Sequence, residues 1–236
     1  MSVSRETVAA LAKRYALPPD ATDRLVALLE ALASEPAAPT TVTEPREAVD
    51  RHLADSLSGL EIPALRRAAR IADLGAGAGF PGLPLAIALP DAQVDLVEST
   101  RRKCDVITRL ATAADIPNAR ALATRAEELA STTAAGTYDV VTARALASLP
   151  ILVEYAAPLL RQGGHLIAWK GTPDPTEHQA GAQAAQILGL RPQDPIPVHP
   201  FKGSRRRTLY TYEKTAPTPS RFPRRPGIPT KRPLAG

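Results

Sequence analysis

The segment 70–82 constrains the fold more than any other part of the chain. A short apolar run leads into three glycines at alternate positions, Gly75, Gly77 and Gly79, and a stretch of helical character follows at 83–89. Glycine permits backbone conformations and close approaches to a ligand that a side chain would prevent. A strand, a glycine turn and a helix in this order predict an α/β unit with a ligand at the turn.

A carboxylate stands beside this turn. Asp73 is expected to place a negative charge in the crevice where the following helix offers free N–H groups. That mixture suits a zwitterionic ligand such as S-adenosylmethionine, with its amino-acid end and sulfonium. Residues 77–82 also fit the dinucleotide pattern G-x-G-x-x-G, which alone is weak evidence. Because a carboxylate beside a pyrophosphate is unfavourable, the local chemistry favours the methyl donor over NAD.

A second carboxylate follows the next predicted strand. Glu98 stands at the end of an apolar run (92–97), where an acid accepts hydrogen bonds from ribose hydroxyls in either class of cofactor. The alternative is that Glu98 caps the helix that begins near Thr100.

Strand-like and helical runs alternate through the middle of the chain. Strands are expected at 70–74, 93–97, 119–123, 139–142 and 165–169, and helices at 83–89, 101–114, 126–130 and 148–160. A helix at 176–188 and two strands, at 195–199 and 207–212, complete the pattern. This alternation predicts an α/β fold with a doubly wound, mostly parallel, seven-stranded sheet. Parallel strands with a strand pair at the end are the Rossmann-like layout of class I S-adenosylmethionine-dependent methyltransferases.

The regions flanking this alternation predict a division into three parts. Residues 5–34 indicate two helices broken at Pro18-Pro19, and a third helix is expected from Pro45 to Leu60. We expect residues 1–62 to form a helical extension packed on the core, 63–214 a methyltransferase domain, and 215–236 a basic, proline-rich tail.

Charge is distributed unevenly along the chain. Residues 201–236 hold ten Lys and Arg and one acid, a charge of +9, whereas the rest holds 19 basic and 23 acidic residues, a charge of −4. A near-neutral body with a basic end predicts a handle for a polyanion. Six prolines between Pro217 and Pro233 predict that this end is an extended arm. The alternative is a solvated tail that only aids solubility.

Composition excludes several other classes of protein. The single cysteine, Cys104, excludes a disulfide framework and a cysteine-built zinc site, and we expect it to fill the buried face of a helix. No metal site is predicted. Because no apolar run approaches membrane-spanning length and no signal-peptide core is visible, we expect a cytoplasmic protein without a membrane partner.

The loops after the strands limit the chemistry. The fourth strand reads 139-DVVTAR-144, without the Asn/Asp-Pro-Pro-aromatic loop typical of transfer to an exocyclic amine. No catalytic acid or base is predicted, which is consistent with guanine N7, whose lone pair is already nucleophilic. Arg144 is expected near the donor or the base, with an electrostatic role, or on a phosphate; the alternative is an ion pair with Asp139 or Glu127. Glu127 is expected at an adenine edge, or else is an ordinary first-turn acid.

Several blocks together resemble one family. They are His52-Leu-Ala-Asp-Ser-Leu57, Asp73-Leu-Gly-Ala-Gly-Ala-Gly-Phe-Pro-Gly82, Arg125-Ala-Glu-Glu128, Thr142-Ala-Arg-Ala145, Trp169-Lys-Gly171 and the tail 217–234. The chain resembles the ribosomal small-subunit methyltransferase G family, also called glucose-inhibited division protein B. The resemblance implies N7 methylation of one guanine in the 530 loop of 16S rRNA, with S-adenosylmethionine as the donor. It departs from the family at 41–43, where Thr-Val-Thr replaces the usual Asn-Leu-Thr, and this puts the role of the N-terminal helices in doubt.

The resemblance also implies site residues. Family donor contacts map onto Gly75, Phe80, Ala126, Glu127 and Arg144, and the local chemistry adds Gly77, Gly79 and Glu98. His52 and Asp55, three residues apart on a predicted helix, could pair at its sheet-facing side, either as a packing and capping pair or as a contact to rRNA. The partner is expected to be 16S rRNA or the 30S subunit, and the protein a monomer. The expected RNA-binding residues are Lys170, Arg205, Arg206, Arg207, Arg224, Arg225, Lys231 and Arg232.

Two other functions stay open. An NAD-dependent reductase would use the same glycine turn, although no Tyr-x-x-x-Lys hydride site is visible. A ribosome-assembly protein would bind 16S rRNA around a vestigial donor pocket without turnover.

Overall fold

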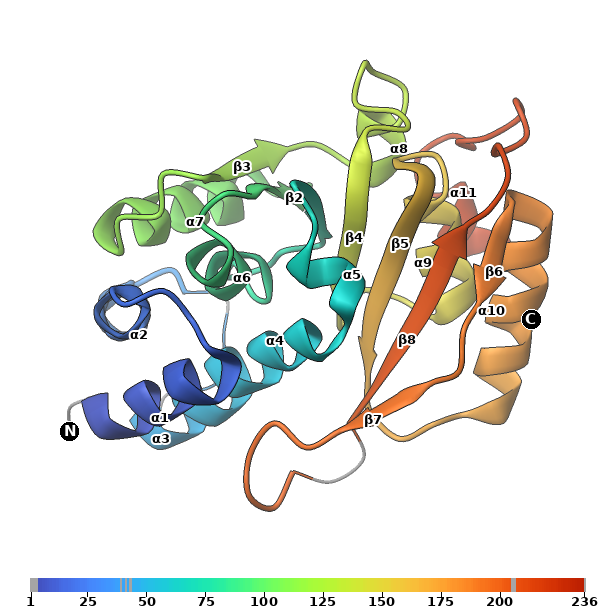
Figure 1. Ribbon diagram of the computed structural model, residues 1–236. Coiled ribbons are helices and arrows are strands. Elements are labelled where there is room, and N and C mark those ends of the chain that lie inside the picture. The colour runs from blue at the N-terminus through green and yellow to red at the C-terminus, as the bar shows by residue number, and fades with distance from the viewer. Residues whose placement is uncertain (1–3, 39, 41, 43, 205–206, 236) are drawn as a thin grey trace.

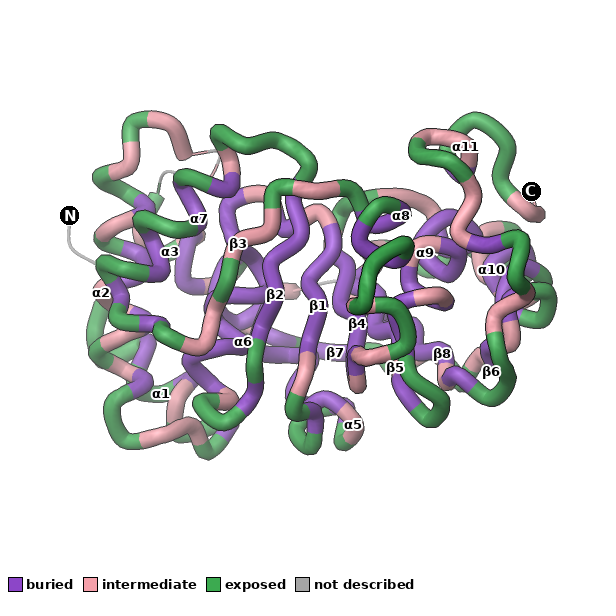
Figure 2. Tube along the Cα trace, turned by 90° about the horizontal axis from the view of Figure 1, so that it is seen from above, coloured by how far each residue is buried: buried purple, intermediate pink, exposed green. Residues whose placement is uncertain are grey.

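A computed structural model shows one mixed sheet through the centre of the molecule, with helices on both faces (Figure 1). The structure describes residues 4–38, 40, 42, 44–204 and 207–235. The sheet therefore divides the protein into two helical layers, and its central strands are deeply buried (Figure 2).

The strand order reverses in the middle of the sheet. In spatial order the strands are β3 (Ala119–Ala123), β2 (Gln93–Glu98), β1 (Arg70–Leu74), β4 (Tyr138–Arg144), β5 (Leu160–Lys170), β8 (Arg207–Lys214) and β6 (Leu190–Pro192). Strands β3 to β5 are parallel, and β8 runs antiparallel to β5. Chain connections leave β1 in one direction and β4 in the other, and this switch point opens a crevice at the strands' carboxyl ends.

The seventh position of the sheet is shared by two short strands. Strand β7 (Ile196–Val198) and strand β6 both pair with β8, along the edge that β5 leaves free. The expected doubly wound, mostly parallel sheet is confirmed, and in the described residues it has eight strand segments in seven positions. Strand β6 was not predicted from the sequence.

Strand residues alternate between two apolar clusters, one on each face. Ile71 packs into the cluster under the first helical layer and its neighbour Ala72 into the other, as the alternation of side chains along a strand requires. The first layer includes α6 (Gly82–Ala88) and α7 (Arg101–Ala113). The second layer contains α8 (Ala126–Leu129), α9 (Leu149–Ala156) and α10 (Pro175–Leu188).

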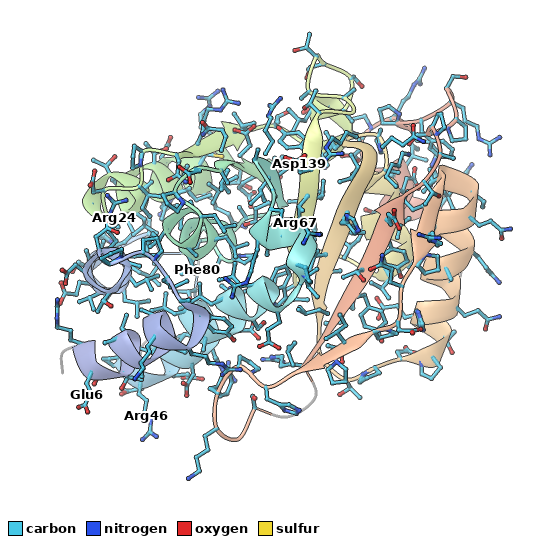
Figure 3. All side chains as sticks on the ribbon, viewed as in Figure 1. Glu6, Arg24, Arg46, Arg67, Phe80 and Asp139 are labelled. Atoms are coloured by element: carbon cyan, nitrogen blue, oxygen red, sulfur yellow. The ribbon has the colours of Figure 1, made fainter. Side chains whose placement is uncertain are left out.

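The N-terminal helices join the first layer. Helices α1 (Arg5–Tyr15) and α2 (Ala21–Ser34) are separated at the expected Pro18-Pro19 break and bury their apolar faces on the core. Figure 3 shows Phe80 on the side of these helices, whereas Glu6 and Arg46 point away from the body.

The expected helix at 45–60 is interrupted by other helical geometries. Helix α3 (Pro45–Ala48) continues into a π-helical turn η1 (Val49–Ala54), α4 (Asp55–Leu57) and a 3₁₀ turn η2 (Ser58–Glu61). Helix α5 (Pro63–Arg66) then leads to β1.

The C-terminal tail folds back onto the second layer. Phe222 is buried in that layer's apolar cluster, and a short helix α11 (Ile228–Lys231) lies beside α9 (Figure 1). The expectation of an extended arm is wrong, because Phe222 and the Arg224–Glu154 ion pair hold the tail on the body. Pro229 stands in the first turn of α11, where its missing N–H costs nothing.

Candidate functional site

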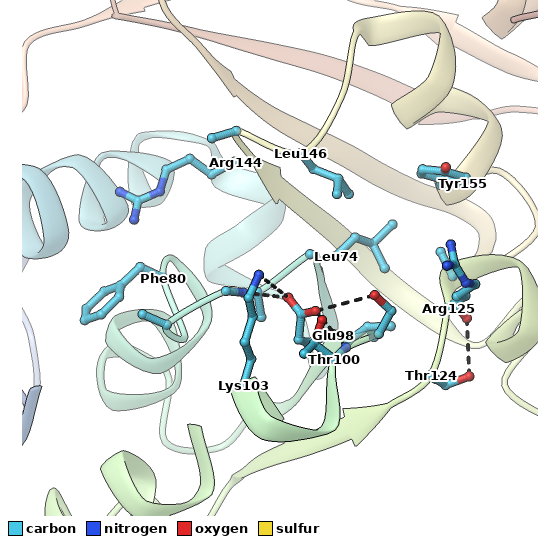
Figure 4. A pocket seen from close by; sticks show the side chains of 18 of the residues that line it. Leu74, Phe80, Glu98, Thr100, Lys103, Thr124, Arg125, Arg144, Leu146 and Tyr155 are labelled. Atoms are coloured by element: carbon cyan, nitrogen blue, oxygen red, sulfur yellow. Dashed lines mark hydrogen bonds and ion pairs between the residues drawn. The ribbon is translucent and has the colours of Figure 1, made fainter. Parts of the chain in front are cut away.

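A cavity of about 520 Å³ opens at the carboxyl ends of β1, β2 and β4 (Figure 4). Parallel strands bring their end loops to the same edge of the sheet, so residues far apart in the chain meet there. Seven of the eight predicted donor residues line this cavity: Gly75, Gly77, Phe80, Glu98, Ala126, Glu127 and Arg144.

The three glycines of the turn serve different purposes. Gly77 has φ of +60°, and a Cβ built there would meet nothing nearer than Gly75 O at 3.8 Å, so bare backbone faces the cavity. At Gly75 a Cβ would meet Leu146 Cδ1 at 2.6 Å. Gly79 is not among the lining residues, because its open side faces Leu83, whose Cγ would lie 2.8 Å from a Cβ. Gly79 therefore permits helix packing rather than close approach of a ligand.

Asp73 does not place its charge in the crevice, and that expectation is wrong. The carboxylate is fully buried and accepts hydrogen bonds from Gly82 N at 2.9 Å and Thr142 Oγ1 at 2.8 Å. It thus fixes the N-terminus of α6 to β1 and β4, and it takes the helix N–H group that was expected to face a ligand. Burial raises the pKa of Asp73 to about 6.

Glu98 lines the cavity and also accepts a hydrogen bond at the start of α7, as its capping alternative predicts, whereas its binding of ribose hydroxyls stays a prediction. It is 6 % exposed and accepts hydrogen bonds from Thr100 N at 2.9 Å and Gly77 N at 3.3 Å. Lys103 Nζ lies 3.9 Å from Glu98 Oε2 (Figure 4). Glu98 therefore ties the glycine turn to the start of α7 while its carboxylate remains part of the cavity wall.

Glu127 provides a second buried carboxylate. It is 5 % exposed, stands in the first turn of α8, and lines the cavity. Its Oε1 accepts a hydrogen bond from Gly227 N at 2.9 Å. Tyr155 and Arg125 lie at this end of the cavity, and Phe80 and Arg144 lie at the other (Figure 4).

Arg144 forms an ion pair with a partner that was not predicted. Its Nη1 donates to Asp55 Oδ2 at 2.9 Å and to the backbone oxygen of Arg51 at 2.8 Å. The alternatives of Asp139 or Glu127 are wrong: Asp139 instead pairs with Arg161. The second oxygen of Asp55 accepts from Arg207 Nε at 3.1 Å, so one buried carboxylate holds two guanidinium groups.

His52 and Asp55 do not pair in the described part of the chain. The His52 Nε2 atom lies 3.1 Å from Thr40 Oγ1, and the imidazole stacks on Phe80 with ring centroids 4.5 Å apart. Burial, with Arg144 and Arg51 nearby, lowers the pKa of His52 to about 4, so the ring is neutral at pH 7.

A second cavity, of about 380 Å³, adjoins the first. The two share His52, Arg144 and Ala145. The other residues that line the second cavity are Arg51, Asp55, Trp169, Lys170, Gly171 and Arg207. Four cations against one carboxylate give this cavity a positive character.

The predicted RNA-binding residues fall into three groups. Three of them form ion pairs within the protein: Lys170 with Glu177, Arg207 with Asp55, and Arg224 with Glu154. Three others are exposed: Arg225, Lys231 and Arg232. Arg205 and Arg206 lie outside the described residues.

Sequence reasoning missed several lining residues, among them Thr40, Lys103, Leu146 and Tyr155. Tyr155 carried the best available signal, since it is a polar-tipped aromatic in a helix whose other residues, apart from Glu154, are apolar. In the described ranges, the structure shows no group of His, Cys, Asp and Glu side chains that would hold a metal ion. None of the helices described is both long and apolar enough to cross a membrane.

Comparisons with known proteins agree on one family. The family model described as rRNA small subunit methyltransferase G (GidB) matches residues 23–206. A protein named Ribosomal RNA small subunit methyltransferase G from Rubrobacter xylanophilus is 42 % identical over 197 residues, which are 82 % of this chain and 76 % of the relative. A protein of the same name from Chloroflexus aggregans is 45 % identical to this chain, over 83 % of this chain and 82 % of the relative.

Solved structures with the same fold have diverged far in sequence. Fibrillarin from Aeropyrum pernix, in complex with S-adenosyl-L-methionine, matches with a TM-score of 0.53 at 18 % identity, covering 67 % of this chain and 72 % of that one. Fibrillarin from Methanococcus jannaschii matches with a TM-score of 0.52 at 19 % identity, covering 69 % and 74 %. These likenesses show the class I methyltransferase fold.

Proposed function

We propose that this chain, which belongs to the rRNA small subunit methyltransferase G family, transfers the methyl group of S-adenosylmethionine to N7 of a guanine in the 530 loop of 16S rRNA. The observation that carries the proposal is the pair of adjoining cavities at the switch point, one walled by buried carboxylates and the other rich in arginine. The donor is a cationic nucleoside and the acceptor a polyanion, so each cavity suits one substrate.

The residues of the first cavity fit the donor. Glu98 retains acceptor capacity for ribose hydroxyls beyond the two backbone N–H groups that it holds. Glu127 has one oxygen not engaged by Gly227, which suits the exocyclic amine of an adenine. The bare backbone at Gly77 allows the amino-acid end to approach closely. S-adenosylmethionine supplies an electrophilic methyl group on a sulfonium.

Methyl transfer to guanine N7 needs no general acid or base from the protein. The N7 lone pair forms the new N–C bond while the electron pair of the broken C–S bond stays on sulfur, and no proton leaves N7. The protein therefore acts by holding the two substrates in line and excluding water. Arg144 stands on the wall common to both cavities, where it suits a phosphate or the guanine O6.

Three further features belong to the proposal. The substrate is 16S rRNA or the 30S subunit, with Arg225, Lys231 and Arg232 on phosphates and Arg207 at the acceptor cavity. The protein works as a monomer in the cytoplasm. Its parts are a helical extension (1–62), the methyltransferase domain (63–214) and the tail (215–236).

A transfer assay tests the proposal. Labelled S-adenosylmethionine is supplied with 30S subunits that lack 530-loop methylation, and mass spectrometry identifies the modified base. N7-methylguanine in that loop is the expected result. Binding of S-adenosylhomocysteine and rRNA without transfer would instead favour the assembly protein, and binding of NADH alone the reductase.

A matched pair of glycine substitutions links the activity to the cavity. Gly77 and Gly136 both have positive φ, +60° and +64°, and open space at the Cβ position, but only Gly77 lines the cavity. Both Gly77→Ala and Gly136→Ala carry the same backbone strain. Gly77→Ala should lose methyl transfer beyond what Gly136→Ala loses, and equal losses would contradict the placement of the donor.

A further inference from the structure

We infer that the C-terminal segment 222–230 supports the lining residues Glu127 and Tyr155 of the donor cavity, so that the affinity for the methyl donor depends on it. The inference rests on the proposed function, since it takes the first cavity as the donor site. It gives the tail a role that a phosphate-binding arm would not have. Three contacts carry it, each made by a different residue of the segment.

The strongest contact anchors the tail to α9. Arg224 donates two hydrogen bonds to Glu154, one from Nε and one from Nη2, in a bidentate ion pair. Glu154 is only 2 % exposed, so its charge is compensated by a residue 70 positions later in the chain. A buried charge without its partner is costly, and therefore the tail cannot leave this position freely.

The second and third contacts reach residues that themselves line the cavity. Gly227 N donates to Glu127 Oε1 at 2.9 Å, and Thr230 Oγ1 lies 3.1 Å from the hydroxyl of Tyr155. Glu127 and Tyr155 are both lining residues, and Tyr155 follows Glu154 directly in α9. The tail thus contacts the end of the cavity at Tyr155. Tyr155 lies away from Arg144, which stands at the other end (Figure 4).

Apolar packing fixes the start of the segment. Phe222 is buried in the same cluster as Ala126 and Leu129 of α8. Ala126 precedes Glu127 and lines the cavity as well. Arg224 and Gly227 bond to the helices that carry Tyr155 and Glu127, and Phe222 packs in the apolar cluster beneath them, so losing the tail should displace these two side chains.

Two arginine substitutions separate this role from phosphate binding. Arg224→Gln removes the anchor, whereas Arg221→Gln removes the same charge from an exposed arginine that lies over the Phe222 ring and has no ion pair within the described chain. The full-length variants are titrated calorimetrically with S-adenosylhomocysteine and separately with 30S subunits. Thr230→Val is a third variant, which removes only the hydroxyl facing Tyr155 and leaves no buried charge.

The expected result is a loss of donor affinity that follows the contacts and not the charge. Arg224→Gln should weaken S-adenosylhomocysteine binding about tenfold and Thr230→Val about threefold. Effects of this size are expected for residues that act on a ligand through the lining residues that they contact. Arg221→Gln should stay within about twofold of the wild type, as exposed positions do. The 30S affinity reports the loss of positive charge alone, and it should not follow the order of the donor affinities.

Two results would overturn the inference. The inference is wrong if folded Arg224→Gln binds S-adenosylhomocysteine within about twofold of the wild type, because substitutions at exposed positions cause changes of that size. If thermal melting shows that Arg224→Gln is unfolded, Thr230→Val decides instead, and an unchanged donor affinity in that variant would contradict the inference. A wild-type protein that binds no S-adenosylhomocysteine would show a different failure, that of the proposed donor site itself.

Discussion

The two cavities that meet at Arg144 differ in the sign of their buried charges. In the donor cavity the buried charged groups are the carboxylates of Glu98 and Glu127, and the cations Lys103 and Arg125 on the same wall are more exposed. In the second cavity, the buried carboxylate of Asp55 is surrounded by cations. Because charges act more strongly where water is displaced, we expect the buried charges to select the ligand of each cavity. The comparison teaches that one edge of a sheet can hold a cationic and an anionic substrate side by side, if a buried ion pair separates them.

The largest effect is expected from removing the Asp55 carboxylate, which lies between Arg144 and Arg207. Asp55→Ala leaves Arg144 and Arg207 without their shared partner, and losing one side of a buried pair costs about 3–5 kcal/mol. We expect the lower end of that range, because Arg207 is partly exposed. Urea unfolding measures the loss. As a control, Asp20→Ala breaks a more exposed ion pair with Arg24 and should lower the free energy of unfolding by under about 1 kcal/mol. Equal losses in the two variants would contradict the stabilising role of the buried Asp55 carboxylate.

Acidification should weaken the boundary between the cavities through His52. Its folded pKa of about 4 lies below its ordinary 6.5, so the unfolded chain binds a proton first, and stability falls as the pH drops from about 6.5 to 4. The full shift corresponds to roughly 3 kcal/mol. Asp73, whose pKa is raised to about 6, acts in the opposite direction in the same window, because the folded state binds its proton more tightly.

A variant isolates the contribution of the imidazole. In His52→Gln the free energy of unfolding still depends on the titration of Asp73 but no longer on that of His52. The difference in free energy of unfolding between wild type and variant should therefore narrow towards pH 4. Denaturant unfolding at several pH values tests this. Parallel curves would mean that His52 titrates normally in the folded protein.

On the donor side, Glu98→Ala should lower the affinity for S-adenosylhomocysteine. Hydrogen bonds to a charged group contribute about 1.5–3 kcal/mol, which predicts a loss of at least tenfold. Glu98→Gln, which keeps one acceptor oxygen, should lose less. Calorimetric titration measures both, and an order reversed from this one would argue against ribose recognition by the carboxylate.

The smallest effect is expected at the exposed cations of the tail. Arg225→Gln and Lys231→Gln should each lower the slope of log affinity for rRNA against log salt concentration by about 1, if each residue neutralises one phosphate. Filter binding over a range of salt concentrations gives the slope. A slope unchanged from the wild type would exclude these residues from the RNA interface.

Local signals in the sequence explain what could be predicted. Strand β1, the glycine turn and Glu98 lie within one short stretch, so strand periodicity and turn chemistry were enough to place them at a shared edge. Contacts between distant residues carry no such signal. The partners of Asp55 are Arg144 and Arg207, 89 and 152 positions away, and nothing local indicates either pair.

The misplaced residues share one physical cause. The sequence shows that Asp73 ends a strand but not which way its side chain turns, and Thr142 with Gly82 draws it into the interior. Likewise the prolines of the tail allow an extended arm, whereas Phe222 and the buried charge of Glu154 draw the tail onto the body. In each case tertiary contacts outweighed a local preference.

Steady-state kinetics with both substrates varied test the division between the cavities most directly. Glu98→Ala and Arg207→Gln are compared with the wild type, with S-adenosylmethionine and unmethylated 30S subunits as the varied substrates. The account predicts that Glu98→Ala raises the KM for the donor alone and Arg207→Gln the KM for the subunit alone. Two KM values that rise together in both variants would contradict it.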